Sequence, residues 1–147
     1  MSVELDSVTN PFKFYKGIED PEEARQAMTH DLIALSSHIH MLNASKGWWH
    51  DPHTGKRKQR AVGDLLMLVH SEISEGYEAW RKSLPDDHLP QFPGLDAELG
   101  DAMIRLFDMI GGLNLSTCEA IPAKLEYNFS RVDHTMAHRA LPGGKKL

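Results

Sequence analysis

Two consecutive stretches of the chain carry an apolar stripe at helical spacing, and a pair of carboxylates three residues apart borders each stripe. In residues 58–83 the stripe follows alternating steps of four and three, and the pair is Glu72 and Glu75. In residues 95–113 the pair is Glu98 and Asp101. Side chains three apart lie on the same side of a helix and can reach a common point. These stretches therefore predict two packed helices that bring four carboxylates together.

The loop between the two stretches is short, which favours antiparallel neighbours. The first stripe consists of Val62, Leu66, Val69, Ile73, Tyr77 and Trp80, and we expect it to face the core. A polar row runs beside the second stripe at steps of three, four and three: Glu98, Asp101, Arg105 and Asp108. Asp108 is expected to be structural or solvated.

The remaining segments also indicate helices. Asp20 followed by Pro21 and two acids predicts a helix start, and this helix is expected to run to about Ser45. Residues 46–57 are expected to form a loop, and a last helix is predicted from Ser116 or Pro122 to about Arg139. No segment resembles a strand. The sequence thus predicts an all-α bundle of four to five helices.

The predicted domain organisation is simple. An N-terminal arm (residues 1–20) precedes a single helical domain (residues 21–140), and a flexible basic tail follows (residues 141–147). The net charge of −5 argues against a general nucleic-acid-binding protein, which would present a basic face. The chain contains a single cysteine, Cys118, and no apolar run long enough to cross a membrane. No signal peptide is evident, so we expect a cytoplasmic protein without a membrane partner.

The carboxylate pairs indicate a metal site. Four crowded anions repel one another unless a cation lies between them, and carboxylates suit hard ions such as Mg²⁺, or alternatively Mn²⁺. A di-iron bundle would need histidine three residues after a glutamate, and no glutamate here has one. Since Mg²⁺ with open positions binds phosphate oxygens, the residues favour a small helical phosphohydrolase.

Further polar residues extend this hypothesis to a nucleotide. Lys124, Asn128 and Arg131 share one helix face and offer a point charge, a neutral donor and a fork of donors to phosphate oxygens. Trp49, in the loop, could stack a base. His40 and Asn43, near the end of the first helix, could hydrogen-bond the edge of that base. The alternative for the first three is an exposed helix face, and for the tryptophans a plug at the end of the core.

Together these residues resemble the MazG-like, all-α nucleoside triphosphate pyrophosphohydrolase superfamily. The resemblance lies in Glu72-x-x-Glu75 followed by Glu98-x-x-Asp101, and in Lys124-x-x-x-Asn128-x-x-Arg131 late in the chain. His40 followed by Trp49 is similar to the base-pocket pair of the dCTP pyrophosphatase branch. The resemblance covers roughly residues 30–135.

The resemblance implies hydrolysis of a (deoxy)nucleoside triphosphate to the monophosphate and pyrophosphate, with Mg²⁺, by a homodimer or homotetramer. Glu72, Glu75, Glu98 and Asp101 would hold the metal, and Glu72 or Glu75 would orient or deprotonate the attacking water. Lys124 and Arg131 would hold the phosphates, and Lys145 and Lys146 of the tail are further candidates. The alternatives are a non-catalytic helical dimerisation or regulatory module, and a carboxylate bundle with another, redox-type reaction.

Overall fold

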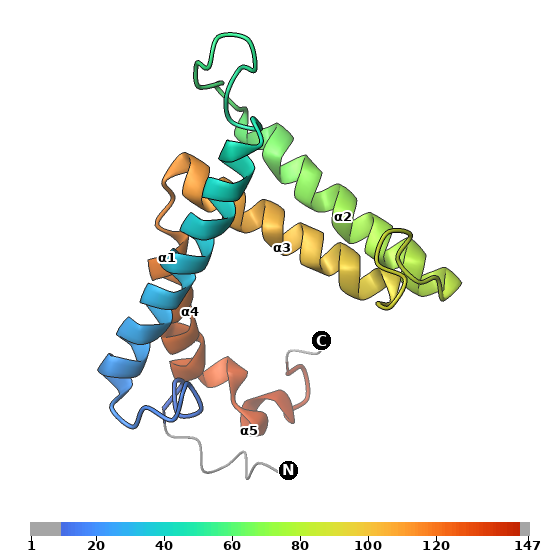
Figure 1. The fold of residues 1–147 in the computed structure, drawn as a ribbon. Helices are drawn as coiled ribbons and strands as arrows, with labels where there is room; N and C mark the ends of the chain where they lie inside the picture. Colours follow the sequence, from blue (N-terminus) through green and yellow to red (C-terminus); the bar gives the residue numbers. More distant parts are fainter. Residues whose placement is uncertain (1–9, 145–147) are drawn as a thin grey trace. The chain divides into compact units, whose positions relative to one another are not determined.

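The regular elements of the protein are helices. The computed structural model describes residues 10–144, and within that range it contains no strand, as the sequence predicts. The helices are α1 (Pro21–Ser45), α2 (Val62–Lys82), α3 (Gly94–Leu113), α4 (Thr117–Ser130) and α5 (Met136–Arg139), with a 3₁₀ turn at Val132–His134 (Figure 1). The all-α class is therefore confirmed.

The described residues form two compact units. One unit is Ala34–Leu115, with the second half of α1 and all of α2 and α3; the other combines the residues up to Ile33 with those from Ser116. The predicted domain of residues 21–140 thus includes parts of both units. The start of the predicted arm (residues 1–9) and the tail lysines Lys145 and Lys146 lie outside the described residues.

The start of α1 has the predicted cap. The backbone N–H of Glu23 donates to Asp20 Oδ1 at 2.8 Å, and Pro21 occupies the first helical position, where a missing N–H has no cost. The described part of the arm lies on this helix, since the Tyr15 hydroxyl donates to Asp31 Oδ2 at 2.5 Å. This hydrogen bond to a carboxylate is the main reason that the pKa of Tyr15 is raised to about 12.

Helices α2 and α3 pack side by side (Figure 1), but not through the predicted stripe. The buried residues of α2 are Leu65, Val69, Glu72 and Gly76. A Cβ on Gly76 would lie only 3.2 Å from the Cβ of Glu98, so this glycine allows the two backbones to approach closely. Of the predicted stripe only Val69 is buried, and the other members are exposed: Val62, Leu66, Ile73, Tyr77 and Trp80. The expectation that this stripe faces the core was wrong for this chain.

Two glycines near the end of α3 admit the elements that pack on it. A Cβ on Gly111 would lie 2.7 Å from the Cβ of His40 on α1, and a Cβ on Gly112 would overlap the indole of Trp49. Trp49 forms the buried core of this unit with Leu65 and Met109. Gly111 thus allows α1 to approach α3, and Gly112 provides the space in which Trp49 of the following loop enters the core.

Two predicted helix boundaries were wrong. Helix α2 begins at Val62 and not at residue 58, because the backbone N–H of Lys58 donates to the carbonyl of Trp49 at 2.9 Å and holds this segment in the loop. The last predicted helix is broken after Ser130, where Arg131 adopts an extended conformation. A new short helix, α5, begins after Thr135, whose side chain accepts from the His138 N–H.

Candidate metal and ligand site

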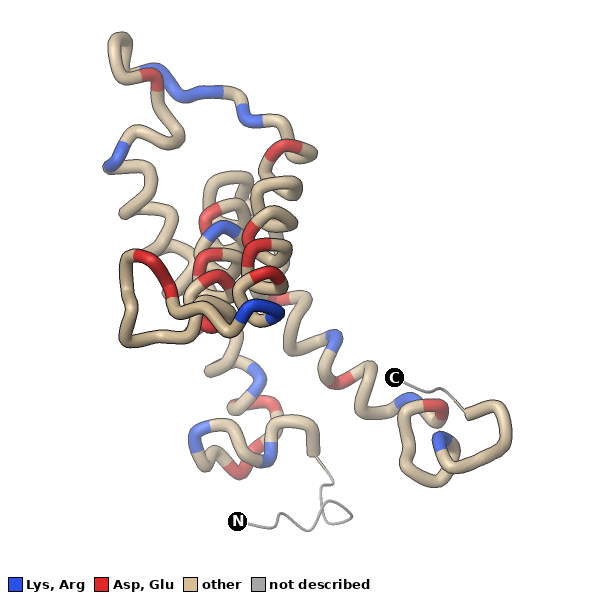
Figure 2. The backbone as a smooth tube through the Cα atoms, turned by 90° about the vertical axis from the view of Figure 1, so that its right-hand side faces the viewer, with Lys and Arg blue, Asp and Glu red and all other residues tan. Residues whose placement is uncertain are grey.

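Three of the four predicted carboxylates converge. Ligand oxygens of Glu72 on α2 and of Glu98 and Asp101 on α3 all lie within 4.8 Å of one another. Figure 2 shows the acidic positions gathered on the two helices. Oxygens bound to a common hard ion at about 2.0–2.6 Å cannot be more than about 5 Å apart. The spacing and the all-oxygen donor set therefore fit one hard divalent cation.

The electrostatics of this cluster are those of crowded anions. The pKa of Glu98 is raised from 4.5 to about 7, first by burial, then by a hydrogen bond with Glu72 and by the charges of Glu75, Glu72 and Asp101. A hydrogen bond between two carboxyl groups requires a proton, and below about pH 7 Glu98 carries that proton when no metal is bound. A divalent cation could take the place of that proton.

Glu75 lies beside the cluster. It is exposed on α2 and is not one of the three residues whose oxygens converge, although its charge contributes to the raised pKa of Glu98. Of the four carboxylates predicted to hold the metal, three converge in this arrangement, and their binding of a metal stays a prediction.

The raised pKa of Glu98 predicts a pH-dependent stability. The folded state binds this proton more tightly than the unfolded state, so the stabilisation is complete below about pH 4.5 and is lost as pH rises through about 7. In chelator, the free energy of unfolding contributed by Glu98 should fall by on the order of 2–3 kcal/mol across that window. Urea unfolding of wild type and Glu98→Gln at pH 5 and pH 8 measures it. If the free energy of unfolding changes equally with pH in wild type and in Glu98→Gln, Glu98 is not the titrating group.

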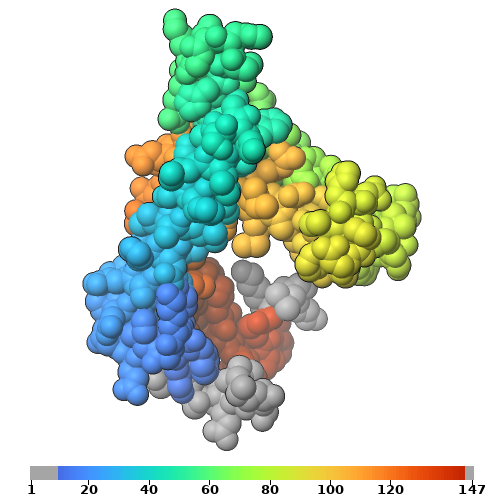
Figure 3. Space-filling view, in the orientation of Figure 1, coloured from blue at the N-terminus to red at the C-terminus, as the bar shows by residue number. Residues whose placement is uncertain are grey.

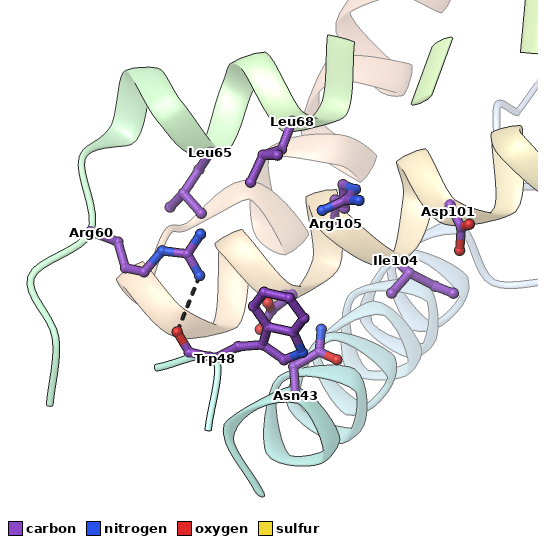
Figure 4. A pocket seen from close by; sticks show the side chains of 9 residues that line it. Asn43, Trp48, Arg60, Leu65, Leu68, Asp101, Ile104 and Arg105 are labelled. Atoms are coloured by element: carbon purple, nitrogen blue, oxygen red, sulfur yellow. Dashed lines mark hydrogen bonds between the residues drawn. The ribbon is translucent and has the colours of Figure 1, made fainter. Parts of the chain in front are cut away.

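A cavity of about 180 Å³ adjoins the cluster and shares Asp101 with it. Its polar lining comprises Asn43, Trp48, Arg60, Asp101, Arg105 and Asp108, and its apolar lining comprises Leu65, Leu68 and Ile104 (Figure 4). Arg60 donates to the backbone carbonyl of Trp48 at 3.2 Å. Both residues belong to the loop between α1 and α2, which protrudes at the top of Figure 3.

The predicted base-stacking tryptophan is in the core. Trp49 is 1% exposed, and its indole N–H donates to Asp108 Oδ1 at 2.8 Å. His40 packs edge-on against Trp49, with its Nδ1 2.9 Å from the same Asp108 oxygen. Asp108 is thus structural, as expected. Neither His40 nor Trp49 lines the cavity, whereas Asn43 and Trp48, which is 60% exposed, both do.

The predicted phosphate-binding residues belong to the other unit. Lys124 and Asn128 lie on α4, and Arg131 directly follows it. The Lys124 ammonium lies 4.9 Å from the centroid of the Tyr127 ring, and the Arg131 guanidinium forms an ion pair with Asp133 at 2.5 Å. Their binding of phosphate stays a prediction.

Sequence reasoning did not identify the cavity residues Trp48, Arg60 and Arg105 as candidates for binding a ligand. Arg105 had a signal, because it falls in the polar row with Glu98 and Asp101, one turn after Asp101. For Trp48 and Arg60, the sequence contains no signal that distinguishes them from Trp49 and Arg57, which are nearby residues of the same type.

Comparison with protein-family models, curated proteins and solved structures finds no match to this chain. Among the described helices, none combines the length and apolar character needed to cross a bilayer.

Proposed function

We propose that this chain is a Mg²⁺-dependent nucleoside triphosphate pyrophosphohydrolase, related to the MazG-like superfamily that its motifs resemble. The observation that carries the proposal is the convergence of Glu72, Glu98 and Asp101 beside a cavity that shares Asp101. A donor set of carboxylates alone favours Mg²⁺ or Mn²⁺ over the histidine-containing site of a redox bundle.

In this proposal Glu72, Glu98 and Asp101 hold the metal, whose chemistry is to polarise the phosphate and to lower the pKa of a bound water. Glu75, exposed beside the cluster, orients or deprotonates the attacking water. Lys124, Asn128 and Arg131 keep the phosphate-binding role that the resemblance implies.

Trp48 and Asn43 are proposed to contact the base. Stacking of a base on an exposed aromatic ring contributes about 1–3 kcal/mol, so Trp48→Ala should raise KM about 5- to 150-fold. Because Trp48 is 60% exposed, the same change should cost less than about 1 kcal/mol of stability. Steady-state kinetics and urea unfolding measure the two effects. Phe14→Ala, which removes an exposed aromatic ring of the other unit, serves as the control and should change neither.

The test of the reaction is pyrophosphate release from a panel of ribo- and deoxynucleoside triphosphates, with Mg²⁺ and with chelator, for wild type and Glu75→Gln. Metal-dependent release that is lost in the variant would support the proposal, and the panel would name the base. If no nucleotide releases pyrophosphate, a thermal-shift measurement with Mg²⁺ distinguishes an unusual substrate from a non-catalytic module. The module predicts no effect of Mg²⁺ on the melting temperature.

The exposed stripe of α2 supports assembly of at least two copies. A row of large apolar side chains along one helix is typical of an interface, and here it includes Ile73, Tyr77 and Trp80. We expect Tyr77→Asp to dissociate the homo-oligomer, as measured by light scattering after size exclusion. Ser74→Asp places the same charge on an exposed position of α2 beside the stripe and should leave the oligomer intact. A wild-type monomer would contradict this part of the proposal.

A further inference from the structure

Arg105 supplies a positive charge to the carboxylate cluster through an ion pair with Glu72. One of its terminal nitrogens lies 2.5 Å from Glu72 Oε1. The Glu72 side chain is only 7% exposed, whereas that of Arg105 is 40% exposed. A buried carboxylate is tolerated when it is paired, so Arg105 compensates Glu72 from the solvent side.

The same guanidinium faces the cavity. Arg105 lines it from α3 together with Arg60, and Trp48 and Asn43 line it from the end of α1 and the loop that follows (Figure 4). Arg105 Nε is shielded from solvent and has no hydrogen-bond acceptor among the described residues. A guanidinium offers five N–H donors in a planar fork, which matches the oxygens of a phosphate. Its pairing with Glu72 leaves most of this fork for a ligand in the cavity.

We propose that the Arg105 guanidinium separates from Glu72 when a divalent metal ion binds that carboxylate. Arg105 then binds a phosphate oxygen of the substrate. This inference rests on the metal site of the proposed function. A second cation on Glu72 repels the guanidinium, and a phosphate in the neighbouring cavity attracts it. The move would also free the Nε donor from its buried position. Arg105 therefore links occupation of the metal site to phosphate binding, so that each favours the other.

Movement of Arg105 from Glu72 to phosphate predicts opposite effects of its removal on metal affinity and on phosphate affinity. A purely structural role of Arg105 does not predict this combination. Without Arg105, Mn²⁺ meets no competing cation at Glu72, whereas phosphate loses a charged donor. We expect Arg105→Gln to bind Mn²⁺ alone about threefold or more tightly than wild type. The same variant should bind pyrophosphate, supplied as its Mn²⁺ complex, about tenfold or more weakly. Calorimetric titration of Mn²⁺, and then of the complex, measures both affinities on the full chain. Arg81→Gln removes an arginine of α2 that pairs with Glu78, and should change neither.

Arg105→Lys provides a second test should Arg105→Gln fail to fold. It keeps the charge but loses the fork, so Mn²⁺ affinity should stay near that of wild type while pyrophosphate affinity falls severalfold. Weaker Mn²⁺ binding by both variants would show that Arg105 only positions Glu72, and unchanged pyrophosphate affinity would exclude contact with phosphate. Either result overturns the inference but leaves the metal site standing. If the wild type binds no Mn²⁺, the metal site itself is refuted, and the inference with it.

Discussion

Glu98→Gln is expected to abolish metal-dependent turnover while making the metal-free protein more stable near pH 8. Glu98 is partly buried, and its burial, a hydrogen bond with Glu72 and the charges of the neighbouring carboxylates together raise its pKa to about 7. A neutral amide removes that repulsion and can donate to Glu72 the hydrogen bond that now needs a proton. We expect a gain of about 1–3 kcal/mol in the free energy of unfolding in chelator.

The same substitution removes one of the three converging ligands. A catalytic divalent ion supplies several kcal/mol of transition-state stabilisation, so turnover should fall by about 10³ or more. Mg²⁺ should no longer raise the melting temperature. Pyrophosphate release and thermal unfolding, with Mg²⁺ and with chelator, measure these effects.

The matched control is Glu78→Gln. Glu78 is a glutamate of α2 outside the cluster, where it pairs with Arg81 and Lys82. Turnover and the response to Mg²⁺ should be those of wild type, and the loss of stability should be small because these ion pairs are exposed to solvent. A Glu98→Gln protein that is less stable than wild type in chelator would contradict the electrostatic account of the cluster.

Trp49→Ala is expected to cost about 3–5 kcal/mol of stability, the usual loss when a buried tryptophan is truncated. Trp49 packs with Leu65 and Met109, and its indole fills the space above Gly112. Truncation also removes the hydrogen bond from the Trp49 indole to Asp108 Oδ1, which then keeps its contact with His40. Urea unfolding in chelator measures the loss without interference from metal binding.

Trp48→Ala is the natural comparison, because it makes the same truncation one residue earlier in the chain. The stability loss should be several times smaller than that of Trp49→Ala, since Trp48 is exposed. If the order of the two losses is reversed, the assignment of Trp49 to the core and Trp48 to the ligand is wrong.

The start of α1 and the shared side of Glu98 and Asp101 on α3 could be predicted from the sequence, because each depends only on residues close together in the chain. Asp20 and Pro21 fix the start of α1 through a hydrogen bond and a backbone preference that involve only adjacent residues. The three-residue spacing within Glu98-x-x-Asp101 places both carboxylates on one side of α3 in any helical fold. The convergence of these two with Glu72 follows once α2 and α3 pack together.

The side of α2 that meets α3 could not be predicted from apolar periodicity. The contact uses Gly76 and a buried Glu72, and neither adds to an apolar stripe. Gly76 contributes by its missing side chain, and Glu72 is acceptable there because Arg105 and Glu98 satisfy it. Both compensations come from residues of α3, so the sequence of α2 alone contains no signal for them.

The roles of Trp48 and Trp49 were likewise decided by distant partners. The two residues are adjacent and chemically identical, and only Trp49 meets Asp108 and the surface of Gly112 on α3. The break after α4 has a similar origin, because Arg131 turns out of the helix to pair with Asp133 and Thr135 then caps a new helix. Side-chain competition of this kind is invisible to helical periodicity.

The most direct test of the central claim is the position of Mn²⁺ in crystals of the protein, located by its anomalous scattering. The account predicts one strong peak within about 2.0–2.6 Å of oxygens from Glu72, Glu98 and Asp101, and no peak in crystals of Glu98→Gln. A peak bound by other residues, or none at millimolar Mn²⁺ with Arg105 still paired to Glu72, would contradict it.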